Sequence, residues 1–221
     1  MMGVDEALRG RHSSRSFRPD PIPEETLREI LEVASYAPSG ANMQPWLVWV
    51  VSGDRLAQIS REILDHIHHG GGHLSDYDYY PSEWFSPYKQ RRIATGVGLY
   101  EILGIERSDR KARDAQWHKN YLWFGAPVVL FVMVDKRLMP GSFLDLGAFM
   151  QSVCLAAHAR GIGSCIQAST AEYGQIVRRV LGVDEGKVMA YSIVLGYADE
   201  APENSYRPAR VSIDEFATFI S

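Results

Sequence analysis

Residues 143–159 set the strongest constraint on what this chain folds into, because they are almost wholly apolar. Asp145 is the one residue in the run that is charged at neutral pH, and apolar side chains occur at every position around a helix. A helix that is apolar on all sides must be buried on all sides. Since a chain of 221 residues has limited core to cover such a helix, a dimer interface would supply the remaining cover.

The bulk composition predicts one globular domain, residues 1–221, with 46% hydrophobic residues. A net charge of −4 gives no attraction to nucleic acid or to an anionic membrane. Cys154 and Cys165 have no metal or CxxC spacing, which favours free thiols in a reducing compartment. The longest uncharged stretch is too short to span a membrane, so we expect a cytoplasmic protein with no membrane segment.

Hydrophobic periodicity predicts helices separated by short strands. We expect a helix that Pro23 opens and Pro38 ends, one that Thr170 caps, and a last one with a capping box at Ser212. The remaining predicted helices are residues 54–67, 88–105, 109–123 and 143–159, and the predicted strands are residues 47–51, 128–134, 162–167 and 189–195. The pattern indicates an α+β or α/β fold, with a sheet of four or five strands and helices on both faces.

Residues 68–87 interrupt this pattern with three consecutive glycines followed by five aromatic residues. Three glycines cannot form a stable helix interior. We expect an irregular or mobile loop that acts as a lid, in which Trp84 and Phe85 contact the substrate. The alternative is that these aromatic side chains pack in the core or at a dimer interface.

The segment RHSSR at residues 11–15 has the composition of an anion-binding turn. Guanidinium groups pair bidentately with phosphate, and serine hydroxyls add hydrogen bonds. The loop PSGANMQPW at residues 38–46 joins small residues and amides, which suits close approach to a flat ligand. Taken singly, a solvated basic turn and an ordinary helix-to-strand connection explain these segments as well. The GIG at residues 161–163 and the arginines Arg207 and Arg210 are weaker signals.

Together these segments resemble the FMN-dependent nitroreductase family over nearly the whole chain. Residues 11–17, RHSSRSF, are similar to the family's opening motif RxSxR/K-F, and residues 38–46 are similar to its PSxxNxQPW signature. The segment GAP at 125–127, the apolar helix with GIG, and LGYA at 195–198 followed by two arginines match the family in order and spacing. Residues 70–90 and 117–124 most resemble the branch that reduces nitroaromatic compounds, including nitrobenzoate reductases.

The resemblance implies a role for each matched residue. Arg11, His12 and Ser13 would contact the FMN phosphate and ribityl chain together with Arg210 and Arg207, while Arg15 would lie toward the pyrimidine side of the ring. The other implied flavin contacts are Pro38, Ser39, Gly40, Asn42 and Gln44, from the partner subunit, and Ile166, Gln167 and Ala168, along the ring. Many relatives carry Pro-x-Glu-Gly near this last stretch, so the backbone N–H that faces flavin N5 stays open. The pair Lys119 and Asn120 is a further candidate at the ring edge.

The resemblance also implies the fold and the reaction. It implies an α+β fold with a central mixed β-sheet, flanked by helices, in an intertwined homodimer. It implies FMN-based reduction of nitroaromatic or similar electron-poor small molecules, with NADPH or NADH as donor, in a ping-pong cycle without a catalytic protein nucleophile. Flavin, quinone or enone reduction and reductive dehalogenation are alternatives on the same scaffold.

Two alternatives come from other classes of protein. His66, His68, His69 and His73 lie near Asp65, Asp76 and Asp78, and such side chains can bind Zn²⁺ in a hydrolase. The triple glycine argues against a rigid site, so we predict no metal there. A flavin-binding protein without enzymatic activity is the other alternative, because fold does not fix function.

Overall fold

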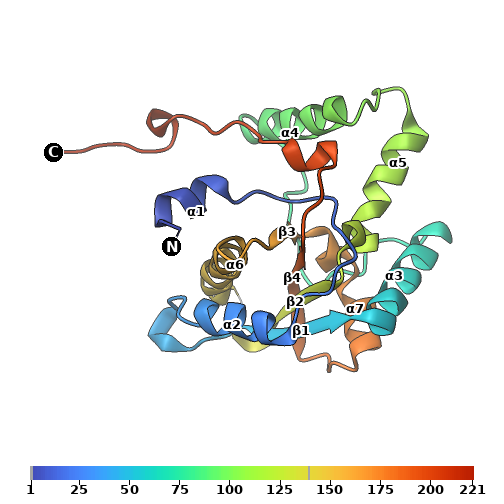
Figure 1. Cartoon of the computed structure of the whole chain (residues 1–221), viewed down its shortest axis with the longest axis horizontal. Coiled ribbons are helices and arrows are strands. Elements are labelled where there is room, and N and C mark those ends of the chain that lie inside the picture. Colours follow the sequence, from blue (N-terminus) through green and yellow to red (C-terminus); the bar gives the residue numbers. More distant parts are fainter. Residues whose placement is uncertain (1, 139) are drawn as a thin grey trace.

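A computed structural model describes residues 2–138 and 140–221 and gives the chain an α+β fold around one antiparallel sheet (Figure 1). The strands are β1 (Leu47–Ser52), β2 (Val128–Asp135), β3 (Gly163–Gln167) and β4 (Lys187–Gly196), and their order in the sheet is β1-β2-β4-β3. The edge strands are therefore β1 and β3. All four predicted strands are confirmed, with ends that differ by one or two residues.

Alternating side chains of β2 form two cores, one on each face of the sheet. Val128, Leu130 and Val132 belong to the first core, and Val129 and Phe131 belong to the second. Successive side chains of a strand point to opposite faces, so a strand that is apolar throughout must be covered on both. Helices α2 (Glu24–Ala34) and α6 (Ser142–His158) pack on the first face, while α3 (Gly53–His68) and α7 (Gly174–Leu181) pack on the second.

The prediction of a mixed sheet within the chain is wrong. Each named strand pairs with its neighbour in antiparallel fashion. The one parallel pairing in the described part of the chain is the isolated bridge between Ser13 and Ser164. Strands β2 and β3 run in the same direction, because both are antiparallel to β4, but β4 lies between them in the sheet, so they form no parallel ladder.

Three helix boundaries also differ from prediction. Thr170 is not a cap, because its hydroxyl bonds the Ser192 hydroxyl at 2.8 Å, and a 3-10 turn (Ser169–Tyr173) precedes α7. The helix predicted over 109–123 is α5 (Arg110–His118) followed by a 3-10 segment (Lys119–Gly125) in which Trp123 and Phe124 have φ of 54°. The capping box at Ser212 is present, but it begins a single 3-10 turn (Ile213–Glu215) and not a helix.

Helix α6 is apolar around its circumference, yet the chain alone covers only one side of it. Leu146, Phe149 and Val153 are buried against the sheet. On the opposite side Leu144 is 82% exposed, and Leu155 is only partly buried. The uncovered side of α6 therefore remains available for a partner.

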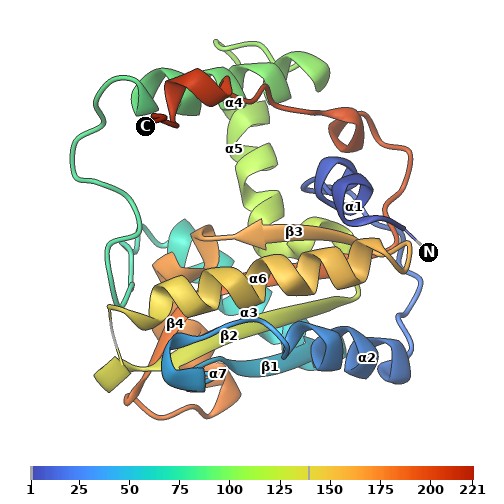
Figure 2. The ribbon, with the colours of Figure 1, turned by 90° about the vertical axis from the view of Figure 1, so that its left-hand side faces the viewer.

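The N-terminal helix α1 (Val4–Gly10), helix α4 (Tyr88–Ile102) and the last residues of the chain lie away from the sheet (Figure 2). Helix α4 has no buried residue, and it contacts the C-terminal segment through an ion pair of 3.3 Å between Arg91 and Glu215. Helix α5 links α4 to the sheet layer (Figure 2). Over the described residues, no helix combines the length and the hydropathy needed to cross a membrane.

Candidate flavin site

The basic segment at residues 11–15 lies along the free edge of β3. The Ser14 N–H donates to the Ser164 carbonyl at 2.9 Å, which continues the sheet by one bridge. Just before it, Gly10 lies against the C-terminal end of α6, where a Cβ at this position would be 2.6 Å from His158 Nε2. The backbone is thus fixed on both sides, and the segment is held in one place relative to β3 and α6.

Basic side chains of this segment and of the C-terminal loop form a cluster that has no carboxylate partner among the described residues. Among the described residues, no carboxylate lies within ion-pair distance of Arg11, His12, Arg15, Arg207 or Arg210. Arg11 Nε is buried and has no hydrogen-bond partner in the described part of the chain. A buried donor of this kind is costly unless a ligand satisfies it. The residues therefore fit the phosphate group of FMN.

His12 is the titratable member of this cluster. Burial lowers its pKa below 6.5, and the nearby cations Arg207, His158 and Arg11 lower it further, while a hydrogen bond from Nδ1 to the Gly10 carbonyl at 3.1 Å raises it. Arg207 is consequently close enough to act on His12. Arg210 is exposed, and its guanidinium donates to the Pro208 carbonyl at 2.9 Å.

A buried polar network continues from this segment toward the end of β3. The Arg15 N–H donates to Asn204 Oδ1 at 2.7 Å, and Asn204 Nδ2 donates to the Ser16 carbonyl at 2.8 Å. At the far end, Gln167 Nε2 donates to the Asn120 carbonyl at 2.8 Å. The structure thus places Arg15 and Gln167, both predicted ring contacts, on one continuous wall.

At the end of β3 the main chain is more available to a ligand than the side chains are. Gln167 is buried, and its amide oxygen also accepts from the Ser192 hydroxyl at 3.4 Å, so the amide is occupied within the protein. Ile166 packs against the first core, and Ala168 is half-buried. These three residues would therefore contact a flavin mainly through their main chain.

The loop at residues 38–44 has an unusual backbone. Ala41, Asn42 and Gln44 have φ between 49° and 56°, the left-handed region that side chains disfavour. Two hydrogen bonds hold it, from the Gln44 N–H to Ser39 Oγ at 2.9 Å and from the Gly40 N–H to Asp145 Oδ1 at 3.0 Å. Strain of this kind gathers at functional sites. Gly40 to Gln44 are exposed, and so is Pro38, so the loop presents its polar groups outward.

This loop and the basic segment lie at opposite ends of α6 in one chain. The loop is bonded to Asp145 near the start of the helix, and Gly10 contacts His158 at its end. At 1.5 Å per residue these two positions are about 20 Å apart along the helix axis. One chain therefore does not bring its two predicted flavin-binding motifs together.

The loop after α3 is irregular over residues 69–87, but its first part is firmly held. Asp76 forms a buried ion pair with Arg178 at 2.6 Å and accepts from the Met189 N–H at 3.2 Å, and the Tyr77 hydroxyl donates to the Ala190 carbonyl. Beyond it, Trp84 lies beside Tyr80 and under the Arg92 guanidinium, 4.8 Å from the ring centroid. Phe85 is exposed against Tyr88.

The histidines near this loop have other partners. His66 Nε2 lies 2.8 Å from the Gly72 carbonyl, and His69 Nδ1 lies 2.7 Å from the Asp65 carbonyl. The His68 ring packs edge to face against the His118 ring, and His73 Nε2 lies 3.7 Å from Glu172 Oε2. In residues 2–138 and 140–221, no three His, Cys, Asp or Glu side chains are close enough together to hold a metal ion.

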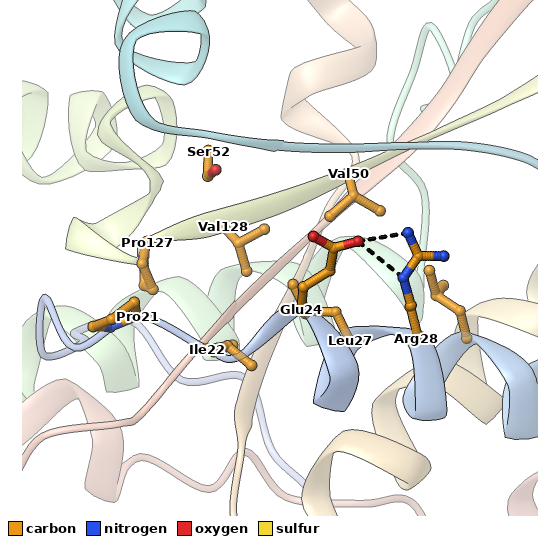
Figure 3. Close-up of a pocket in the computed structure, with 10 residues that line it drawn as sticks. Pro21, Ile22, Glu24, Leu27, Arg28, Val50, Ser52, Pro127 and Val128 are labelled. Carbon is orange, nitrogen blue, oxygen red and sulfur yellow. Dashed lines mark hydrogen bonds and ion pairs between the residues drawn. The ribbon is translucent and has the colours of Figure 1, made fainter.

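A cavity of about 470 Å³ lies elsewhere, between α2 and the edge strand β1 (Figure 3). Ile22, Leu27 and Val128 line it, and Glu24 accepts from Arg28 at its rim. None of the predicted flavin contacts lines this cavity. The candidate site is instead the wall formed by residues 11–15, the end of β3, residues 119–120 and residues 203–207.

The sequence comparison decides the family, because the nitroreductase family model matches residues 8–197. The chain belongs to the nitroreductase family. A 4-nitrobenzoate reductase from Nocardioides sp. (strain LMS-CY) is 34% identical over 220 residues, covering 98% of this chain and 89% of that protein. The predicted resemblance, including its nitrobenzoate reductase branch, is confirmed.

Solved structures of the family agree over the full length. The FMN- and NADPH-dependent nitroreductase NfnB from Sphigopyxis sp. strain HMH has a TM-score of 0.97 and 38% identity, covering 99% of both chains. NfnB from Mycobacterium smegmatis, solved in complex with NADPH, has a TM-score of 0.93 and 32% identity, covering 99% of this chain and 98% of that one. The α+β nitroreductase fold is confirmed.

Some residues of the wall were missed by sequence reasoning. Glu203 and Asn204 lie seven and six residues before Arg210, in a stretch with no motif of its own. Nothing in the local sequence marks them, because their partners Lys119 and Arg15 are distant in the chain. Lys119 and Asn120 were candidates at the ring edge, and the structure places both on the wall.

Proposed function

We propose that the chain is an FMN-dependent oxidoreductase that takes electrons from NADPH or NADH and reduces nitroaromatic or similar electron-poor small molecules. The observation that carries this proposal is the unpaired cation cluster with its buried Arg11 Nε, which lies in the segment that resembles the family's opening motif. Bound FMN supplies the hydride chemistry, and the protein supplies binding and orientation. The NfnB structures support FMN and NADPH as its cofactors.

Different residues along the wall bind different parts of the cofactor. Arg11, His12 and Ser13 hold the phosphate end, with Arg207 and Arg210 adding positive charge. Arg15, the backbone at 166–168 and the Asn120 region hold the ring end, and the main chain there is kept rigid by buried hydrogen bonds. Because donor and acceptor both need access to the ring, they take turns at one site.

We propose a homodimer in which each site combines two chains. The 20 Å separation between the loop at 38–44 and the basic segment supports this, because both can surround one ligand only when the loop comes from a second copy. The uncovered apolar side of α6 supports it independently. Pro38, Ser39, Gly40, Asn42 and Gln44 would then complete the partner's site.

The experiment that tests the proposed function is an anaerobic screen of acceptors on FMN-loaded protein. We expect turnover of nitroarenes with NADPH or NADH, and parallel lines in double-reciprocal plots of initial rate against donor concentration at several fixed acceptor concentrations. Faster turnover of a flavin, a quinone, an enone or a halogenated arene would assign the acceptor to another class. A protein that binds no FMN, or that binds FMN without turnover, contradicts the proposal.

We predict that FMN affinity depends on the ionisation of His12. A phosphate dianion beside His12 raises its pKa, which burial and cations hold below 6.5 in the free protein. The His12 contribution to affinity is therefore full at low pH and is lost as pH rises through the pKa of the complex. FMN titrations of wild type and His12→Asn from pH 5.5 to 8 measure it, since the phosphate itself titrates equally in both. Identical pH dependence in the two proteins would refute the role.

We predict that residues 68–87 form a lid whose exposed part selects the acceptor. Trp84→Ala and Phe85→Ala should each change the ratio of kcat/KM between two nitroarenes by severalfold and leave FMN content intact, because flat rings stack on aromatic surfaces. Val50→Ala, at an exposed position of the edge strand β1 beside the cavity and away from the candidate site, is the control. Loss of FMN or of folding in the loop variants would favour the packing alternative.

A further inference from the structure

We infer that Glu203 is a positioning residue for the flavin ring: its buried carboxylate holds the Lys119 ammonium group on the wall between Arg15 and Gln167. The inference rests on the proposed function, because it assigns a role within the proposed FMN site. It adds Glu203 to that site, and it gives Lys119, so far only a candidate at the ring edge, a defined partner and an electrostatic role.

The contact itself is well defined. Lys119 Nζ lies 3.2 Å from Glu203 Oε1, and Glu203 is only 4% exposed. A buried carboxylate is strongly unfavourable unless a cation or hydrogen bonds compensate it. The Lys119 side chain remains 44% exposed, so this cation is held by the protein on one side and is still accessible to a ligand. Surface ion pairs of two exposed side chains have no comparable constraint.

The position of the pair follows from its neighbours in the sequence. Asn204, next to Glu203, accepts from the Arg15 N–H at 2.7 Å. Asn120, next to Lys119, accepts from Gln167 Nε2 at 2.8 Å. The Lys119–Glu203 pair therefore lies between the two predicted contacts of the flavin ring, on the same wall.

The elements that carry the pair are themselves held in place. Glu203 belongs to a 3-10 turn (Pro202–Ser205), and Asn204 in that turn also donates to the Ser16 carbonyl at 2.8 Å and the Asp199 carbonyl at 3.0 Å. Lys119 begins the 3-10 segment that follows α5. A lysine side chain is flexible, so without the carboxylate its ammonium group would spread over many positions.

The pair has a chemical consequence because reduction adds negative charge to a flavin. A fixed cation near the ring favours the reduced form, and a fixed carboxylate beside that cation opposes it. Removing the charge of Glu203 should therefore make reduction easier, and removing the charge of Lys119 should make it harder. Opposite shifts of this kind are not expected from a purely structural contact.

The test compares the FMN reduction potential of wild type, Glu203→Gln and Lys119→Met, each saturated with FMN. We expect the equilibrium constant for reduction of the bound FMN to be threefold to tenfold larger in Glu203→Gln than in wild type. In Lys119→Met it should be smaller by a similar factor, where tenfold corresponds to about 30 mV for a two-electron couple. Glu203→Ala, which cannot hold Lys119, should in addition bind FMN more weakly than Glu203→Gln. Lys119→Arg should restore most of the wild-type potential.

The matched control is Glu62→Gln, which removes one carboxylate charge from an ion pair of 2.9 Å with Arg179 on the α3 and α7 face of the sheet. Potentials of Glu203→Gln and Lys119→Met that equal the control, or that shift in the same direction, overturn the inference. If Lys119→Met does not fold, Glu203→Gln against the control decides alone. Wild type that binds no FMN would instead refute the proposed function, so the two failures are distinguishable.

Discussion

Replacing Arg11 with alanine is expected to weaken FMN binding by roughly tenfold to a hundredfold, because one charge-assisted hydrogen bond to phosphate contributes about 1.5–3 kcal/mol. Among the described residues Arg11 forms no ion pair with a carboxylate and its buried Nε has no partner, so binding a phosphate breaks no existing ion pair. The variant should purify pale and regain its colour when FMN is added in excess. Fluorescence titration of the apoprotein with FMN measures the change.

The neighbouring Arg9 provides the control for this prediction. Arg9 is an exposed basic residue in the last turn of α1, and Arg9→Ala removes the same charge from the chain. Arg9→Ala should bind FMN as tightly as wild type. Arg210→Ala tests the same role in the C-terminal loop, where the exposed side chain leads us to expect a smaller effect. Equal affinity in Arg11→Ala and wild type would remove Arg11 from the phosphate site.

Leu155→Glu is expected to separate the proposed dimer and to weaken FMN binding at the same time. Leu155 lies on the side of α6 that its own chain leaves partly uncovered, together with Leu144. A buried charge in an apolar interface is strongly unfavourable, and dissociation would separate the loop at 38–44 from the basic segment of the partner. Light scattering should give the monomer mass of 24.8 kDa, with FMN affinity at least tenfold lower.

Met150 is less suited to this test than Leu155. Its side chain packs against the first core of its own chain, so a charge there would damage folding before it damaged an interface. Ala57→Glu, at an exposed position of α3 on the other face of the sheet, controls for the added charge. An active, flavin-bound wild-type species at the monomer mass would refute the shared site directly.

The sequence by itself determined the local structure and the family. The apolar runs at 128–134 and 189–195 predicted buried strands, and the helices around them were predicted from period and capping. The run at 47–51 also predicted a buried strand, but β1 is an edge strand in which Val51 is the one buried residue. The motifs at 11–17 and 38–46 identified the family because they fix backbone and side-chain chemistry over short stretches. Such features depend on residues that are close together in the chain, and they can therefore be predicted from the sequence without knowledge of the tertiary structure.

Tertiary structure decided what depends on distant partners. The antiparallel direction of the sheet was set by connections that periodicity does not describe, and Thr170 lost its expected role as a cap to a hydrogen bond with Ser192. The side-chain amide of Gln167 donates a hydrogen bond to the Asn120 carbonyl. The ion pair of Lys119 with Glu203 joins residues that are 84 positions apart in the chain. The separation of the two flavin motifs along α6 is likewise invisible in the sequence, since only the packed helix sets the distance between its ends.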